Sequence, residues 1–217
     1  MITASDIKDL RNRTGAGMLD CKKALKENDG NVEAAIDWLR QKGISKAAKK
    51  ATRAATEGVV SSYIHAGGKI GVLVEVNAET DFVARTERFQ ELVADIAMHI
   101  AAAAPEYVSR DEVSADAIER EKAVQLARVI EEGKPAHIAE KIVEGRMGKF
   151  YSETCLLDQV FVKDDKKTVG DFLAEAVGTI GENIKVRRFA RFVLGEGLEK
   201  KADDFAAEVA ATAGLDN

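Results

Sequence analysis

A pair of short apolar runs near residue 60 constrains the fold of this 217-residue chain more than any other feature. Val59 to His65 and Ile70 to Val76 are rich in β-branched residues, and only Ala66-Gly67-Gly68-Lys69 separates them. Two such runs joined by a short glycine-containing segment predict a β-hairpin. In the second run the apolar residues recur at every second position, so they share one face. A third run, Lys185 to Leu194, alternates basic and apolar residues, and we expect it to pair with the hairpin.

Helical patterns surround these strands. A helix that starts near Thr80 carries apolar residues at helical spacing and ends at Pro105, and another runs from Thr168 to Ile180. Together they predict an α+β fold, in which helices pack on a small antiparallel sheet. The residues expected on the buried side of the first helix are Phe89, Leu92, Val93, Ile96 and Ile100.

The N-terminal region shows only helical patterns. Thr3 can cap a first helix that stops at Gly15-Ala16-Gly17, a second helix follows from Met18 to Lys26, and a third begins after a polar turn. Three such helices predict a minimal bundle of about 40 residues, which is marginal on its own. The Ala/Lys/Arg-rich segment from Lys42 to Arg53 predicts a solvated linking helix.

Two long helical patterns, Ser114 to Glu132 and Pro135 to Ser152, are separated by a Gly-Lys-Pro reversal. They predict an antiparallel helical hairpin that projects as an arm, because few apolar positions are available for its seam. A final helix is expected from Asp203 to Ala213. In the expected seam, Ile118, Val124, Ala127 and Ile130 face Ile138, Ile142, Met147 and Phe150.

These patterns divide the chain into five predicted parts. They are a three-helix module with its linking helix (1–54), a core hairpin and helix (55–112), the arm (113–152), a core continuation with a helix and a strand (153–195), and a C-terminal helix (196–217).

Charge is distributed unevenly over these parts. Residues 1–55 contain twelve Lys and Arg against seven Asp and Glu, a balance of +5, whereas the whole chain carries −5 and the remainder therefore carries −10. A basic module can meet nucleic acid or an acidic protein face. The start of the chain shows no export signal, no apolar stretch is long enough to span a bilayer, and Cys21 and Cys155 have no metal spacing. We therefore expect a cytoplasmic protein with reduced thiols and no membrane contact.

A search for catalytic motifs finds little. Gly15 to Lys22 lacks the second glycine and the Lys-Ser/Thr pair of a phosphate-binding loop. His65, His99 and His137 lie on three different predicted elements without ligand spacing, and His99 is expected to be a satisfied core or boundary residue. Neither cysteine has a nearby histidine or acid in sequence. Binding is therefore favoured over catalysis, with an enzyme of unrecognised site as an alternative, and no catalytic residue, metal or cofactor is predicted.

The segment Glu79 to Ala84 is unusual. Thr80 can cap a helix, and Asp81 in its first turn complements the positive end of the helix dipole. Phe82 allows two interpretations. Periodicity favours a core position, seven residues before Phe89 on the same face, whereas its place at the junction between hairpin and helix is compatible with an exposed aromatic wedge.

The sequence resembles the elongation factor Ts family over essentially its whole length. Any one of the matching stretches alone is weak, but all of them in the family's order make the resemblance specific. The five stretches are Leu10 to Leu25, Thr80 to Ala84, Ile138 to Met147, Gly181 to Arg188 and Asp204 to Ala210.

The resemblance implies a fold, a partner and a role. The fold would contain an N-terminal module similar to ubiquitin-associated domains, a mixed core, a coiled-coil arm and a C-terminal helix. The role would be guanine-nucleotide exchange on elongation factor Tu, with no direct contact to nucleic acid; the alternative is a nucleic-acid-binding protein that uses the basic module. Only one hairpin-plus-helix unit is visible, as in the short, dimeric form of the family, so we expect a homodimer. The implied roles are disturbance of the partner's magnesium site by Thr80, Asp81, Phe82 and Val83, an effect on its phosphate-binding loop by His65, and partner contact by Arg11, Met18 and Leu19.

Overall fold

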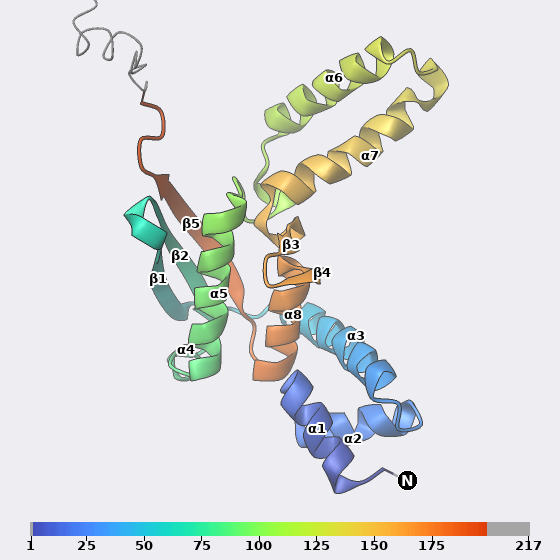
Figure 1. Cartoon of the computed structure of the whole chain (residues 1–217), viewed down its shortest axis with the longest axis vertical. Coiled ribbons are helices and arrows are strands. Elements are labelled where there is room, and N and C mark those ends of the chain that lie inside the picture. Colours follow the sequence, from blue (N-terminus) through green and yellow to red (C-terminus); the bar gives the residue numbers. More distant parts are fainter. Residues whose placement is uncertain (1, 199–217) are drawn as a thin grey trace, which may run out of the picture.

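The computed structural model describes residues 2–198 as an α+β structure with a central three-stranded sheet (Figure 1). The α-helices are α1 (Ala4–Thr14), α2 (Met18–Glu27), α3 (Val32–Lys50), α4 (Asp81–Ala84), α5 (Glu87–Ala103), α6 (Ala115–Glu131), α7 (Ala136–Thr154) and α8 (Val169–Ile180). The strands are β1 (Glu57–His65), β2 (Ile70–Ala78), β3 (Val160–Phe161), β4 (Asp164–Thr168) and β5 (Lys185–Val193).

The predicted hairpin and third strand form one antiparallel sheet. Strand β2 lies between β1 and β5, so both outer strands have a free edge within the described structure. The hairpin register joins His65 to Ile70 at the turn and Glu57 to Ala78 at the other end. Strand β5 pairs with β2 from Ile70–Val193 to Asn77–Lys185, with a bulge between Glu75 and Val76. The prediction that the run beginning at Lys185 pairs with the hairpin is confirmed.

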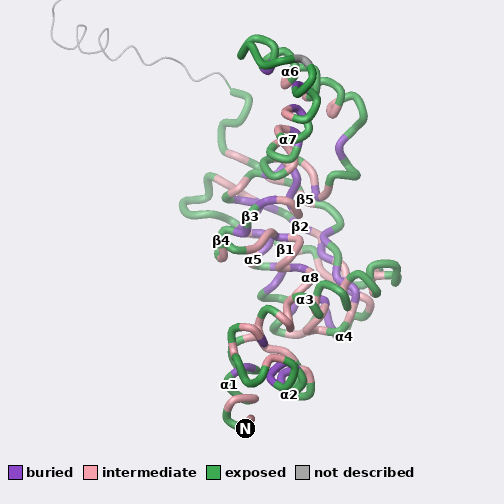
Figure 2. The backbone as a smooth tube through the Cα atoms, turned by 90° about the vertical axis from the view of Figure 1, so that its right-hand side faces the viewer, coloured by how far each residue is buried: buried purple, intermediate pink, exposed green. Residues whose placement is uncertain are grey.

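One face of the sheet carries the main core. The alternating valines of β2 that were predicted to share a face are buried there, and α5 packs against them with its predicted apolar stripe. Helix α8 completes this layer, and Figure 2 shows the buried residues concentrated along the strands and the helices behind them. The most deeply buried side chains of this cluster include Val74, Val76, Phe89, Val93, Ile96 and Ile100.

The three N-terminal helices enclose a small core of their own. Leu10, Cys21, Leu25 and Ala35 are fully buried between them. Thr3 caps α1 as predicted, in a reciprocal capping box in which the Thr3 side chain accepts from a backbone N–H and the Asp6 carboxylate accepts from the Thr3 N–H. The two cysteines of the chain are free and buried, and burial raises the pKa of both thiols.

The segment Lys42 to Arg53, predicted as a solvated linking helix, is helical as far as Lys50, and most of its residues are exposed. Helix α3 continues without interruption through Gly43 to Lys50, and its second half packs against α8. A Cβ atom at Gly178 would lie 2.7 Å from the Gly43 Cα, so the two helices cross backbone to backbone. The missing side chains at both positions permit this approach, so the linking helix is the second half of α3 and contacts the core at Gly178.

Helices α6 and α7 form an antiparallel pair that projects away from the sheet (Figure 1). The predicted seam is partly wrong. Val129 is fully buried in place of Ile130, which is 64% exposed, and Val124 and Ile138 are exposed as well. Adjacent residues differ by about 100° around a helix, so the real contact face of α6 is rotated by one position. On α7 the seam follows a four-residue spacing through Ala139, Val143 and Met147.

The helix predicted to start near Thr80 is two helices. The single turn α4 ends after Ala84, and Thr86 then caps α5 by accepting a hydrogen bond from the Phe89 N–H at 3.3 Å. The short β3–β4 hairpin was not predicted, because β4 consists of the polar residues 164–168 and has no apolar alternation. The helix expected at Asp203 to Ala213 lies outside the described residues.

Candidate functional site

The segment between β2 and α5 presents the most conspicuous exposed side chain of the core. Thr80 accepts a hydrogen bond from the Val83 N–H at 3.3 Å and so caps α4. Val83 and Ala84 point into the main core, with 8% and 3% of their surfaces exposed. Phe82 lies on the opposite side of the same turn and is 77% exposed. The interpretation of Phe82 as a core residue is therefore wrong, and the structure places it as the exposed aromatic.

Asp81 is also accessible and has a local partner. Its carboxylate accepts a hydrogen bond from the Arg85 guanidinium at 2.8 Å, and both side chains are largely exposed. An exposed pair four residues apart contributes at most a few tenths of a kcal/mol. The Arg85 contact can therefore be exchanged for another cation or donor at little cost.

Two residues far along the chain hold this segment in place. The Glu182 carboxylate accepts hydrogen bonds from both the N–H and the hydroxyl of Thr80, and the Asn183 N–H donates to the Glu79 carboxylate at 2.6 Å. Asn183 is 3% exposed, and its side-chain amide donates to the Arg53 carbonyl at 2.7 Å. Sequence reasoning missed the role of this turn, because about a hundred residues separate it from Thr80. The available signal was the Gly181-Glu182-Asn183 stretch, which follows the C-terminus of a helix.

His65 occupies the other end of the hairpin. It ends β1 at the tip, where its Nδ1 atom and the Tyr63 hydroxyl share a hydrogen bond of 3.1 Å. The start of β1 pairs with Ala78, just before α4. A nine-residue strand separates its ends by roughly 26 Å, so the structure does not bring His65 and Phe82 together.

The three N-terminal candidates lie nearer to Phe82. Met18 and Leu19 begin α2 and are 53% and 83% exposed, and Arg11 lies exposed in the last turn of α1. The Arg88 guanidinium, in the first turn of α5, donates to the Gly15 carbonyl at 3.0 Å. This bond ties the α1–α2 turn to the start of α5, and α2 and α4 both lie toward the end of the molecule opposite the arm (Figure 1).

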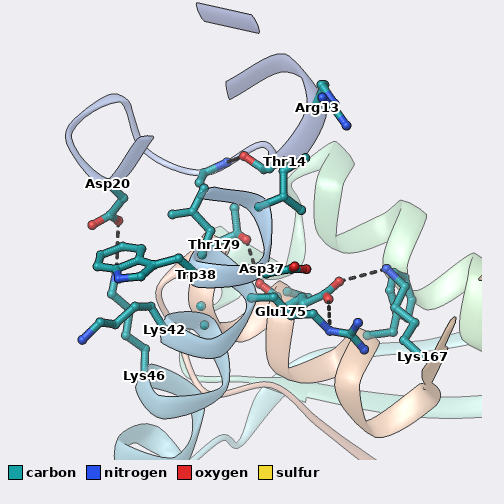
Figure 3. Close-up of a pocket in the computed structure, with 18 of the residues that line it drawn as sticks. Arg13, Thr14, Asp20, Asp37, Trp38, Lys42, Lys46, Lys167, Glu175 and Thr179 are labelled. Atoms are coloured by element: carbon teal, nitrogen blue, oxygen red, sulfur yellow. Dashed lines mark hydrogen bonds and ion pairs between the residues drawn. The ribbon is translucent and has the colours of Figure 1, made fainter. Parts of the chain in front are cut away.

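A cavity of about 820 Å³ lies between the N-terminal helices and the core, bordered by α3, α5 and α8 (Figure 3). Both signs of charge line it. Lys46 pairs with Asp20 at 2.8 Å, and Lys42 lies over the Trp38 ring at 5.3 Å. Eight Lys and Arg and seven Asp and Glu line the cavity, so the two signs of charge nearly balance and do not favour a phosphate or a nucleic acid as its ligand.

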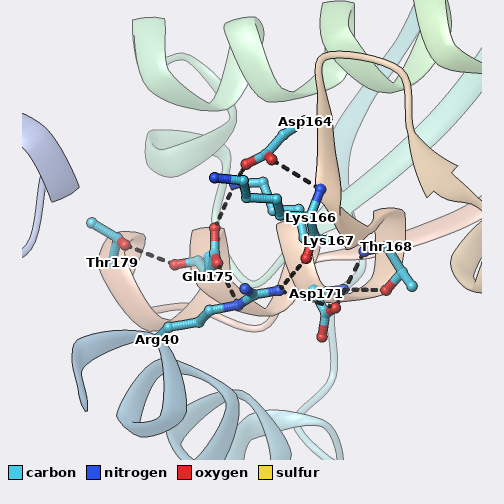
Figure 4. Close-up of polar contacts among 8 residues, drawn as sticks. All are labelled: Arg40, Asp164, Lys166, Lys167, Thr168, Asp171, Glu175 and Thr179. Atoms are coloured by element: carbon cyan, nitrogen blue, oxygen red, sulfur yellow. Dashed lines mark hydrogen bonds and ion pairs between the residues drawn. The ribbon is translucent and has the colours of Figure 1, made fainter. Parts of the chain in front are cut away.

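An ion-pair network that joins α3 to β4 and α8 borders this cavity (Figure 4). Arg40 contacts the Asp171 carboxylate at 3.3 Å and the Glu175 carboxylate at 3.2 Å, and Lys167 contacts Glu175 at 2.9 Å. The side chains are about one-third exposed or less, so solvent screens them only in part. The network therefore fastens the third helix to the core, and it has no spare charge for a ligand.

His99 is a core residue, as predicted. It is fully buried, its Nδ1 atom accepts from the Val162 N–H at 3.3 Å, and its Nε2 atom lies 3.0 Å from the Gln159 side-chain oxygen. These two partners require a neutral ring with the proton on Nε2. Burial lowers the pKa of His99 below its ordinary value of 6.5.

Acidification should therefore destabilise the fold through His99. Below pH 6.5 the unfolded chain protonates this imidazole while the folded protein does not, so the free energy of unfolding falls by at most about 1.4 kcal/mol per pH unit. Stability is lost from pH 6.5 down to the lowered pKa of the folded state. Urea denaturation at a series of pH values between 7.5 and 5 measures the slope, and His99→Gln should flatten it. An identical slope in the variant contradicts this assignment.

Within residues 2–198, no group of three or more His, Cys, Asp or Glu side chains is arranged to hold a metal ion. No buried side-chain nitrogen or oxygen atom of that region lacks a hydrogen-bond partner. Over the same range, no helix combines the length and the apolar character needed to cross a bilayer.

An α+β fold that presents a largely exposed phenylalanine on a firmly hydrogen-bonded turn has the anatomy of a partner-binding protein. The family model described as Elongation factor TS matches residues 20–196. The chain is 65% identical over 214 residues to the elongation factor Ts of Geobacter sulfurreducens and 64% identical over 214 residues to that of Geobacter metallireducens, with 99% of each chain covered in both comparisons. It is 62% identical over 210 residues to the elongation factor Ts of Desulforamulus reducens, with 97% of each chain covered. The chain belongs to the elongation factor Ts family.

Proposed function

We propose that this protein is the guanine-nucleotide exchange factor for elongation factor Tu in translation elongation, acts in the cytoplasm, and has no catalytic site of its own. The observation that carries the proposal is the exposure of Phe82 on a turn whose backbone is fixed by Thr80 and Glu182. Exposed aromatic side chains on rigid supports dominate many protein interfaces. The family membership supplies the identity of the partner.

In the proposed mechanism the GTPase has two conformations: one holds GDP tightly, and the other binds this factor. A GTPase holds GDP through the amides of its phosphate-binding loop and through magnesium. We infer that Phe82 wedges between two helices of elongation factor Tu, with Thr80, Asp81 and Val83 disturbing the magnesium site and His65 the phosphate-binding loop. Because the coupling between the two ligands is reciprocal, the factor lowers the affinity of the GTPase for GDP by the same ratio as GDP lowers its affinity for the factor. An acceleration of about a thousandfold requires roughly 4 kcal/mol of barrier lowering.

The remaining contacts are assigned by the same resemblance. Arg11, Met18 and Leu19 are proposed to bind the partner, and the exposure of Met18 and Leu19 supports this. We further propose that α1–α3 form a module similar to ubiquitin-associated domains, and that α6 and α7 form a coiled-coil arm. The antiparallel packing of α6 on α7 around Val129, Ala139, Val143 and Met147 supports the second assignment.

The direct test measures release of labelled GDP from elongation factor Tu with and without this protein. Acceleration that rises with factor concentration and saturates supports the proposal. If release proceeds at the intrinsic rate at every concentration, the proposed function is wrong.

We also propose a homodimer that forms through the outer face of the sheet. This face carries Val60, Ile64, Leu73 and Phe192, which are between 48% and 69% exposed. The register places Ile64 and Phe192 on either side of Gly71, so the apolar residues extend across all three strands. A second copy of the chain presents the same apolar surface and can cover it.

Replacing Phe192 with aspartate should convert the dimer into monomers, because two buried carboxylates would face the apolar surface of the other copy. Sedimentation equilibrium at micromolar concentration measures the mass. Val124→Asp, at an exposed apolar position of the arm, is the matched control and should stay dimeric. A wild-type protein that sediments as a compact monomer rules the dimer out.

The nucleic-acid alternative receives less support. Several cations of the basic module are engaged by carboxylates, including Arg13 with Glu33 at 2.7 Å and Lys46 with Asp20 at 2.8 Å. A filter-binding assay with a steep salt dependence would favour that alternative.

A further inference from the structure

The turn that carries Phe82 has little stability of its own. Helix α4 contains four residues, fewer than an isolated helix needs to repay the entropy of its first turn. Val83 and Ala84 anchor one side of the turn in the core, but they do not fix the direction of its first residues. The orientation of Phe82 therefore depends on what holds Thr80, the capping residue that precedes the turn.

The Glu182 carboxylate holds Thr80 at two points. One carboxylate oxygen accepts from the Thr80 N–H at 3.0 Å, and the other accepts from the Thr80 hydroxyl at 2.8 Å. Because the hydroxyl donates its proton to Glu182, its lone pairs are available to the Val83 N–H, from which it accepts at 3.3 Å. The carboxylate thus fixes the hydroxyl rotor in the state that caps α4, and hydrogen bonds to a charged acceptor are the stronger kind.

Glu182 is itself fixed by the turn in which it lies. Gly181 ends α8 in the left-handed conformation at φ 93°, which favours glycine, and its carbonyl accepts a hydrogen bond from the Lys50 ammonium. Asn183 is buried and bonds to Glu79 on one side and to the Arg53 carbonyl on the other. The turn 181–183 therefore connects the end of α3 to the start of α4.

We propose that Glu182 is a positioning residue for nucleotide exchange: its carboxylate, held by the 181–183 turn, sets the direction in which Phe82 leaves the surface. This inference rests on the proposed function and deepens it, because Glu182 acts through Thr80. The structure assigns to a residue 102 positions away the role of completing the cap of the α4 turn.

Glu182→Gln tests the proposal with almost no change of shape. The amide oxygen can accept from the Thr80 N–H, but the NH₂ group can meet the Thr80 hydroxyl only as a donor, so the hydroxyl loses its bond to a charged acceptor and its rotor is no longer fixed. At saturating concentration of the variant, GDP release from elongation factor Tu should be about five- to tenfold slower than with wild type, whereas the half-saturating concentration should change less. The matched control is Glu132→Gln, which alters a carboxylate that the Arg146 guanidinium holds at 2.8 and 2.7 Å on the arm.

Thr80 supplies the rescue test. Thr80→Ser keeps both donors and should keep the amides of residues 80–83 as slow to exchange with deuterium as in wild type, whereas Thr80→Val removes the hydroxyl and should lower the maximal release rate as Glu182→Gln does. In a protein that already carries Glu182→Gln, Thr80→Val should lower the maximal rate of GDP release only slightly further, because the two changes break the same contact. Losses that multiply in the double variant contradict the proposal.

Deuterium exchange gives a readout that needs no partner. The amides of residues 80–83 should exchange faster in Glu182→Gln than in wild type, while the midpoint of thermal unfolding should stay near the wild-type value. If wild type accelerates release and Glu182→Gln does so equally well, the positioning role is wrong and the exchange function stands. If wild type fails to accelerate release, the proposed function falls, and the positioning role falls with it.

Discussion

Phe82→Ala should reduce factor-stimulated GDP release from elongation factor Tu at least about tenfold, since truncation of an aromatic anchor commonly costs about 2 kcal/mol or more of binding energy. The ring is 77% exposed, so its removal takes almost nothing from the core. The unfolding midpoint in urea should therefore remain at the wild-type value. Stopped-flow measurement of labelled-GDP release at increasing factor concentrations checks the first expectation, and circular dichroism checks the second.

Two further variants make this test specific. Val160→Ala truncates another exposed apolar side chain, on β3, and should leave the release rate unchanged. His65→Ala alters the far end of the hairpin, and its effect should multiply with that of Phe82→Ala, because distant sites without shared partners act independently. A release rate for Phe82→Ala equal to that of wild type would remove Phe82 from the mechanism.

Phe89→Ala should have the reverse outcome. Phe89 is fully buried between α5 and the sheet, and deletion of a buried phenylalanine costs about 3–5 kcal/mol of unfolding free energy through lost transfer energy and the cavity left behind. Such a loss is a large part of the stability of a typical domain. Urea denaturation followed by circular dichroism measures it.

The residual activity of this variant separates folding from exchange. Phe89→Ala should stimulate GDP release at the wild-type rate per folded molecule at low temperature, because the ring never reaches the surface. A loss of unfolding free energy below about 1 kcal/mol would contradict the prediction. It would mean that the core fills the space of the missing ring far better than cores do in other variants of this kind.

The sheet and its covering helix could be predicted from the sequence because their signals are local. The alternating valines of β2 and the apolar stripe of α5 each repeat several times within one element, and the turn residues 66–69 fix the hairpin between them. Thr3 and Thr80 were recognisable as capping residues for the same reason.

The direction of Phe82 could not be predicted by the same method. Its seven-residue separation from Phe89 implies a shared face only if one helix carries both residues. Thr86 interrupts the helix between them by starting a new one, so the spacing has no meaning there. The face of α6 was misjudged for a related reason: Val129 and Ile130 are equally apolar neighbours, and only packing against α7 decides which of them is buried.

Contacts between distant segments also escaped prediction. The bonds from Glu182 to Thr80 depend on how α8 and β2 are placed in space, and no local pattern reports that. Likewise, the composition around Gly43 predicted a solvated helix, and its close contact with Gly178 on α8 has no local signal in the sequence.

The backbone contact between Gly43 and Gly178 has a consequence for the proposed binding of the partner. With no side chain between the helices and Arg40 bridging to Asp171 and Glu175, the crossing leaves little room for a hinge. The residues of α2 and α4 that are proposed to contact the partner are then held at a fixed separation, so binding by one would present the other at high effective concentration. Folding already fixes this separation. Binding to a partner whose sites have the same separation would therefore lose little further conformational entropy.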